Sequence, residues 1–166
     1  MSLEEQVDAD FSRARRRASF RRLMARLRRD PTRLAPPCFG EVSEALGARG
    51  GGVSLGLRTV STERIAGSVG RFRDFDGEFL PLKQSMVDRW GRIDRAYHRG
   101  VELPAVSLYK VGGYYFVLDG NHRVSVYRYH GVEWVDAYVT ELSPVGRSEL
   151  SAGTTGAVDA QPGQGV

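Results

Sequence analysis

The chain has one cysteine among its 166 residues, and this scarcity excludes two classes of protein. A disulfide framework and a metal site built from several cysteines both need more thiols than Cys38 supplies. No apolar run approaches the roughly 18 residues that cross a bilayer, and no apolar signal segment follows the arginines at 15–17. We therefore expect a cytoplasmic protein without a membrane partner, and we interpret Cys38 as an incidental thiol.

Low-complexity segments at both ends leave room for one compact domain of about 100 residues. The organisation that we expect is an Arg-rich helical arm over 1–35, a Gly-rich linker over 36–56, a folded domain over 57–142 and a disordered tail over 143–166. The glycines at 50–52 do not form a phosphate loop, because neither Lys-Ser nor Lys-Thr follows them.

Positive charge is concentrated in the arm. Residues 1–35 contain ten arginines against five acids, whereas the whole chain carries only +4, so the rest of the chain sums to about −1. The spacing predicts a helix with two apolar stripes that point to nearly opposite sides, namely Val7, Phe11, Ala14 and Ala18, then Phe20, Leu23, Met24 and Leu27. A straight helix would be apolar on two faces, which predicts a break near Ser19 or two different contacts.

The arm allows two interpretations. In one, residues 11–33 bind nucleic acid or another polyanion through their arginines. In the other, which we favour, the helix docks on its own domain and the arginines face the solvent.

The periodicity within 57–142 predicts alternating strands and helices. The β-rich residues 57–65 are expected to contain the first strand. Further strands are expected over 105–110, 114–118 and 133–142, and helices over 83–99 and 121–130. The glycines at 112 and 113 suit a hairpin turn between two of these strands. His98 falls at a helix end, where we expect a solvated side chain or a partner of the helix dipole. We expect Phe72, Phe75 and Phe79 to anchor a loop in the core.

The most informative stretch is 114–126, a hydrophobic strand that ends in Asp119-Gly120 and continues into Asn121-His122-Arg123 and a helix. This order brings backbone amides, an imidazole and a guanidinium to one helix N-terminus, where the helix dipole attracts anions. It therefore predicts a phosphate site. The alternative is an ordinary turn in which Asp119 caps the helix while His122 and Arg123 are solvated.

This stretch, with the proline-led strand at 103–106, resembles the N-terminal domain of ParB partition proteins and the related sulfiredoxins. The Gly-x-His-Arg form is similar to that of sulfiredoxins and of ParB-like free-serine kinases from archaea. The resemblance covers about 58–142. It implies an α+β domain with a short mixed sheet flanked by helices, to which this chain adds an Arg-rich N-terminal helix.

The resemblance also implies a second part of the site. In the ParB-like superfamily the turn after the first strand lies against the nucleotide and often supplies an arginine, a position that Arg71 matches here, with Arg73 as a second choice. The alternative is that both arginines pair with neighbouring acids, which are Asp74, Asp76 and Glu78.

The reaction is constrained by Asn121, which stands where sulfiredoxins carry their cysteine. Without a thiolate, sulfinic acid repair is excluded. We expect binding of a nucleotide phosphate chain, with NTP hydrolysis or phosphoryl transfer as the accompanying reaction. Gly120 and Asn121 would supply backbone amides, His122 and Arg123 would donate to phosphate, and Arg71 would close from the opposite turn.

The expected cofactor is Mg²⁺ with ATP, ADP or CTP, and Asp119 would hold the ion directly or through water. Asp119 and His122 are the candidate catalytic residues. The competing hypothesis is a non-catalytic DNA-associated or regulatory module that acts through the Arg-rich helix. A nuclease is not expected, because no cluster of acids is spaced to hold two metal ions.

Overall fold

The structure is a computed structural model, and it describes residues 1–28, 38–45 and 52–142. The expected tail over 143–166, the last seven residues of the expected arm over 1–35 and part of the expected linker over 36–56 lie outside the described residues. Within the part that is described, no helix combines the length and the apolar composition needed to cross a bilayer.

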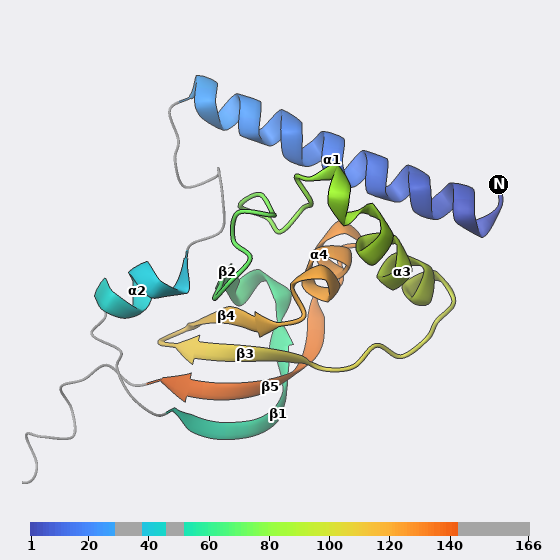
Figure 1. The fold of residues 1–166 in the computed structure, drawn as a ribbon. Coiled ribbons are helices and arrows are strands. Elements are labelled where there is room, and N and C mark those ends of the chain that lie inside the picture. Colours follow the sequence, from blue (N-terminus) through green and yellow to red (C-terminus); the bar gives the residue numbers. More distant parts are fainter. Residues whose placement is uncertain (29–37, 46–51, 143–166) are drawn as a thin grey trace, which may run out of the picture.

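Five strands form one mixed sheet in the order β1-β5-β3-β4-β2 (Figure 1). They are β1 (Val53–Ser61), β2 (Ile65–Ser68), β3 (Val106–Val111), β4 (Tyr114–Asp119) and β5 (Trp134–Leu142). The pairs β1–β5 and β3–β4 are antiparallel, whereas β3–β5 and β2–β4 are parallel. The expected α+β class, with a short mixed sheet flanked by helices, is confirmed.

The β-rich residues 57–65 contain the end of β1 and do not form one continuous strand. The chain leaves β1 at Ser61, passes through a 3₁₀ turn at Thr62–Arg64, and enters β2 at the opposite edge of the sheet. Thr62 holds this turn, since its hydroxyl donates to the Val132 carbonyl at 2.7 Å and its amide donates to the Glu133 carbonyl at 2.9 Å. Strand pairing with β5 also extends β1 back to Val53, inside the expected linker.

In the described parts of the chain the sheet is accompanied by the α-helices α1 (Leu3–Leu27), α2 (Phe39–Ala45), α3 (Val87–His98) and α4 (Asn121–Tyr129). The helix expected over 83–99 is present, with a 3₁₀ turn at Gln84–Met86 before α3. In Figure 1, α3 and α4 lie between the sheet and α1. Trp90 of α3 is fully buried there, and its indole N–H donates to the Ser125 hydroxyl of α4 at 3.0 Å.

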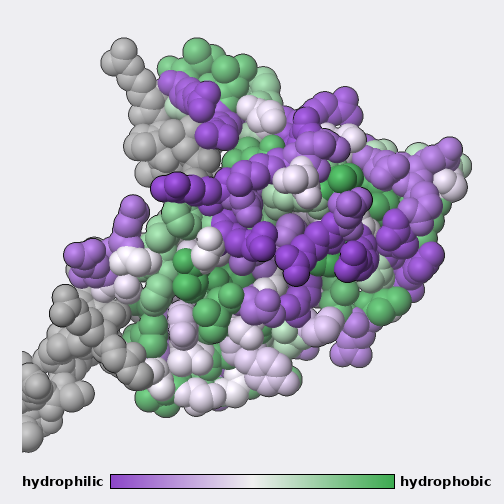
Figure 2. Space-filling model, in the orientation of Figure 1, coloured by the Kyte–Doolittle hydropathy of each residue, from purple (hydrophilic) through white to green (hydrophobic). Residues whose placement is uncertain are grey.

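The N-terminal helix is continuous, so of the two alternatives offered for its apolar stripes, the break near Ser19 is wrong. Ser2 and Glu5 form a reciprocal capping box at its start. The first apolar stripe is buried against the domain, and the Phe11 ring lies 5.6 Å from that of Trp90. The second stripe stays largely outside: Phe20, Leu23 and Leu27 are exposed, and Figure 2 shows hydrophobic surface at this end of α1. The two stripes therefore face different surroundings without a bend.

Polar contacts also attach α1 to the domain, as the favoured interpretation of the arm requires. Near the N-terminus, Glu4 accepts from Arg95 Nε at 2.7 Å. Further along, Arg21 lies 3.3 Å from the Glu78 carboxylate and 3.7 Å from that of the fully buried Asp76. Docking of α1 on its own domain is confirmed. Phe75 and Phe79 are buried as expected, whereas Phe72 is half-buried.

If α1 is an integral part of the fold, Phe11→Ala will lower the free energy of unfolding by about 3–5 kcal/mol, because it opens a cavity beside Trp90. The matched control is Phe20→Ala, which removes the same ring from an exposed position of the same helix and should change stability by less than about 0.5 kcal/mol. Urea unfolding of both variants measures the difference. Equal effects would show that α1 does not dock in solution.

Candidate functional site

The residues expected to bind phosphate line one pocket of about 220 Å³ at the N-terminus of α4. Asp119 ends β4, Gly120 is the N-cap of α4, and the next three residues form the first helical turn. Arg71 reaches the same pocket from the segment after β2. Two lining residues were not expected from the sequence, namely Arg89 and Ile93 of α3. Their spacing of four places them on one face of that helix.

Gly120 permits the turn from β4 into α4. Its φ is 103°, in the left-handed region that favours glycine, and a Cβ would lie 2.6 Å from a Val106 methyl group. No side chain caps the helix, so the alternative in which Asp119 is the cap is wrong. The first backbone amides of α4 therefore have no capping side chain as an acceptor.

His122 is buried, so the alternative of a solvated imidazole is also wrong. Its side chain packs edge-on against Phe75, with ring centroids 5.5 Å apart. Only 7% of His122 is exposed, and neither ring nitrogen has a hydrogen-bond partner among the described residues. Burial, assisted by Arg89 and Arg71, lowers the pKa of His122 from 6.5 to about 4. The imidazole is therefore neutral at pH 7, with one nitrogen able to donate and the other to accept.

Arg123 connects α4 to the segment that precedes β3. Its Nη1 donates to the carbonyls of Pro104 and Ala105 at 2.6 and 2.9 Å, and its Nη2 donates to Asp119 at 2.7 Å. Both terminal nitrogens are thus engaged with the chain itself. Arg123 contributes positive charge to the pocket, but a guanidinium group whose two terminal nitrogens are both free to bind phosphate oxygens must come from another residue.

Arg71 and Arg89 are the more available guanidinium groups, since both are exposed at the pocket. The structure supports part of the alternative for Arg71, whose Nη1 lies 3.5 Å from Asp74. Asp74 is shared with Lys83, which lies 2.5 Å from its other oxygen. Arg73 is not among the residues that line the pocket, and its guanidinium lies over the Phe72 ring at 5.5 Å.

The fit of Mg²⁺ depends on Asp119, the only carboxylate among the lining residues of this pocket. Its side chain is 76% exposed and paired with Arg123. Magnesium prefers several oxygen ligands, and one carboxylate beside three arginines does not hold the ion alone. The residues fit Mg²⁺ only as a companion of phosphate groups that supply the other oxygens.

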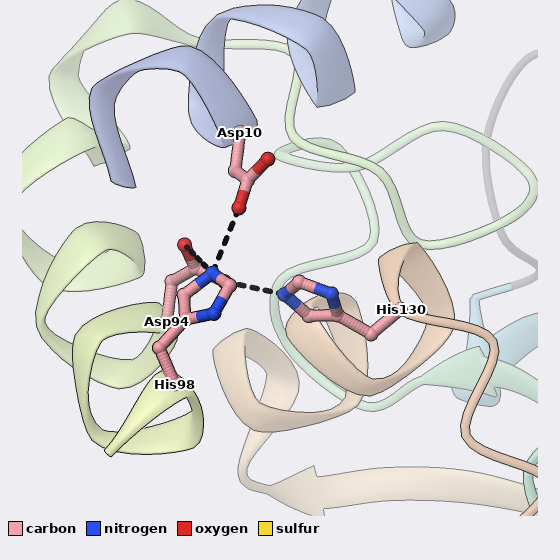
Figure 3. Close-up of side chains that lie close together, drawn as sticks. All are labelled: Asp10, Asp94, His98 and His130. Carbon is pink, nitrogen blue, oxygen red and sulfur yellow. Dashed lines mark hydrogen bonds and ion pairs between the residues drawn. The ribbon is translucent and has the colours of Figure 1, made fainter. Parts of the chain in front are cut away.

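A second polar cluster was not expected from the sequence. His98 is not solvated: its side chain is 18% exposed, and its Nε2 lies 2.8 Å from Asp10 of α1. Asp94 and His130 complete the cluster, which Figure 3 shows beneath α1. The signal available in the sequence was the spacing of four between Asp94 and His98, which places both on one face of α3.

Comparisons with known proteins do not identify a family for this chain. No family model matches the chain, and neither does any curated protein. Among solved structures, the chain is similar to sulfiredoxin from Arabidopsis thaliana, with 13% identity and a TM-score of 0.39, over 51% of this chain and 84% of that one. A likeness this distant assigns neither a family nor an activity.

Because the pKa of His122 is lowered on folding, stability should depend on pH. Between about 6.5 and about 4 the imidazole is protonated in the unfolded chain but neutral in the folded one. Unfolding then takes up a proton, so the free energy of unfolding decreases as the pH falls through this window, by about 3 kcal/mol in total. Urea unfolding between pH 7.5 and 4.5 measures the slope, which should be shallower in His122→Asn. An NMR titration of the His122 ring with a midpoint near 6.5 would contradict this account.

Proposed function

We propose that this protein binds a nucleotide through its phosphate chain, in the pocket at the N-terminus of α4. The observation that carries the proposal is the buried imidazole of His122, whose two nitrogens lack partners among the described residues. Buried polar groups are normally hydrogen-bonded, and an unsatisfied one in a pocket needs an explanation. Both nitrogens are covered in this structure, so a phosphate oxygen would become that partner once the ring turned toward the pocket that His122 lines.

The surroundings of His122 favour an anion over a neutral ligand. The N-terminus of α4 carries the positive end of the helix dipole and has no side-chain cap. Arg71 and Arg89 line the same pocket, and Arg123, which is paired with Asp119, adds a third guanidinium group. Because His122 is neutral, its N–H donates to phosphate without the repulsion that a fourth cation would cause.

The size of the pocket limits what it holds. Its volume of about 220 Å³ is below the roughly 300–1,000 Å³ of pockets that enclose whole small-molecule ligands. It therefore suits phosphate groups, and the nucleoside would lie outside. The pocket does not distinguish among ATP, ADP and CTP, the nucleotides expected from the sequence, because their bases would lie outside it. The resemblance of the motif at 119–123 to ParB-like proteins and sulfiredoxins supports the same ligand class.

If phosphoryl transfer or NTP hydrolysis follows binding, the residues available for it are few. Phosphoryl transfer depends mainly on positioning and charge stabilisation, which the arginines and the α4 amides would provide. Asp119 is the candidate base, since its carboxylate is exposed beside the pocket. Mg²⁺ that arrives with the nucleotide would bridge phosphate oxygens, with Asp119 as a direct or water-mediated ligand.

The test compares two arginines of α3. Arg89 lines the pocket, whereas Arg92, three residues along, is exposed and does not. Isothermal titration with ATP, ADP and CTP, with and without Mg²⁺, should show that Arg89→Gln weakens binding by about 10- to 100-fold, as expected for loss of a charge-assisted hydrogen bond. Arg92→Gln removes the same charge and should change affinity less than about threefold.

Two outcomes would overturn the proposal. Equal losses in both variants would indicate general electrostatic attraction without a site. No binding of any nucleotide to the wild-type chain would exclude the proposed ligand class. A parallel titration with pyrophosphate separates a phosphate site from a nucleotide site, because only the latter gains affinity from the nucleoside.

The alternative of a DNA-associated or regulatory module stays a prediction that rests on α1. Docking engages Arg21 with the domain, but Arg16, Arg22 and Arg26 remain exposed. Binding to phosphates of duplex DNA would weaken steeply with added salt. Fluorescence anisotropy with labelled duplex DNA should then show salt-dependent binding that is lost when these three arginines are changed to Gln. Unchanged binding in that variant would exclude α1 as the contact surface.

A further inference from the structure

Two aspartates and two histidines from three parts of the fold meet under α1, away from the phosphate pocket. Asp10 comes from α1, Asp94 and His98 from adjacent turns of α3, and His130 from the C-cap of α4. One ligand atom from each lies within 4.8 Å of all the others (Figure 3). We propose that these four residues form a binding site for one Zn²⁺ ion.

The distances between the ligand atoms are close to those of a tetrahedral zinc site. His98 Nε2 lies 2.8 Å from Asp10 Oδ2 and 3.5 Å from Asp94 Oδ2, and His130 Nε2 lies 2.6 Å from Asp94 Oδ1. Zinc bonds to imidazole nitrogen and carboxylate oxygen are about 2.0–2.2 Å, so ligand atoms of a tetrahedron lie roughly 3.3–3.6 Å apart. The cluster accommodates the ion if its closest atoms separate by less than about 1 Å.

Burial of the two carboxylates is the second observation that points to a cation. Asp94 is fully buried and Asp10 is 5% exposed. Asp94 Oδ2 has no hydrogen-bond partner among the described residues, and its contact with His98 is long at 3.5 Å. A buried charge is costly unless it is paired or coordinates a metal. One Zn²⁺ would neutralise both carboxylates and provide the missing partner of Asp94.

The helix ends add to the attraction. His98 is the last residue of α3 and His130 is the C-cap of α4, so two helix C-termini converge on the cluster. These ends carry the negative pole of the helix dipole and favour cations. The cluster also opens into a pocket of about 740 Å³, lined by Asp10, His98 and His130, which provides a route of entry.

Neighbouring groups can orient the ligands, as outer-shell groups do at metal sites. The Tyr129 hydroxyl donates to Asp10 Oδ1 at 2.9 Å, and Arg13 lies 3.5 Å from that same oxygen, so Oδ2 is left for the cluster. The Tyr97 ring stacks on His130 at 4.2 Å. His98 Nδ1 lies 3.4 Å from the amide nitrogen Nε2 of Gln6; when His98 binds the metal through its own Nε2, the Gln6 amide would turn over so that its oxygen accepts from Nδ1–H.

The ligand set selects the class of metal. Two imidazoles with two carboxylates suit zinc and similar transition metals, whereas Mg²⁺ and Ca²⁺ prefer oxygen ligands throughout. The ion would connect α1 to α3 and to the end of α4. Zinc binding would therefore stabilise the docked position of the N-terminal helix.

The first experiment titrates the full chain, after chelator treatment, with Zn²⁺ in competition with a chromogenic chelator. We expect one equivalent per chain, and Co²⁺ should give the intense visible absorption of a four-coordinate site. Asp94→Asn and His130→Gln should each weaken zinc binding at least tenfold. His122→Asn is the matched control, because it removes the remaining histidine of the chain and should leave zinc affinity unchanged.

A second measurement needs no variant. Long-range ¹H–¹⁵N spectra of the wild-type rings should show that Zn²⁺ shifts the Nε2 resonances of His98 and His130 and leaves His122 unaffected. The proposal is overturned if the wild-type chain binds no Zn²⁺ at micromolar concentrations. It is equally overturned if His122 responds in place of the other two rings, or if folded ligand variants bind zinc as tightly as the wild type.

Discussion

The burial of Trp90 between three helices is the interaction on which the rest of this structure depends. Its ring packs against Phe11 of α1 and Tyr129 of α4, and its N–H donates to Ser125. These contacts set the position of α3 relative to α4. Both candidate sites include residues of α3 and of α4, so both depend on how these two helices pack around the indole. The hydrogen bond from the indole N–H fixes the orientation of the ring, while the burial of its apolar surface stabilises the packing.

Helix α4 contributes opposite electrostatic ends to the two sites. Its N-terminus, whose first turn has no side-chain cap, lines one pocket together with Arg71 and Arg89, and an anion is favoured there. Its C-terminus holds His130 beside the buried carboxylate of Asp94, where a cation is favoured. His122, close to the N-terminal end, avoids adding positive charge because burial keeps it neutral. One short helix thus separates a proposed phosphate site from a proposed zinc site.

Local patterns predicted most of the elements and part of the pocket. The run at 119–123 is contiguous, so a strand followed by a helix brings its residues to one helix N-terminus whatever the rest of the fold does. The same local patterns did not predict where strand pairing in the sheet divides one β-rich segment. Residues 57–65 have strand-like composition throughout, but the hydrogen bonds of Thr62 divide them between opposite edges of the sheet. Of the two alternatives for α1, the break near Ser19 is absent because its two apolar stripes need not both be buried.

By itself the sequence determined most helices and strands, the Arg-rich N-terminal helix and the candidate phosphate motif, because helical periodicity, strand alternation and a Gly-containing turn are local properties; the α+β class followed from the resemblance of 58–142. Tertiary structure alone decided that Arg89 joins the pocket, that Arg123 binds Asp119 and backbone carbonyls, and that His122 is neutral. It also decided that Asp10 meets His130, which is 120 positions further along the chain. Burial and long-range contact set the charge and the partners of a side chain, and neither is encoded in the spacing of its neighbours.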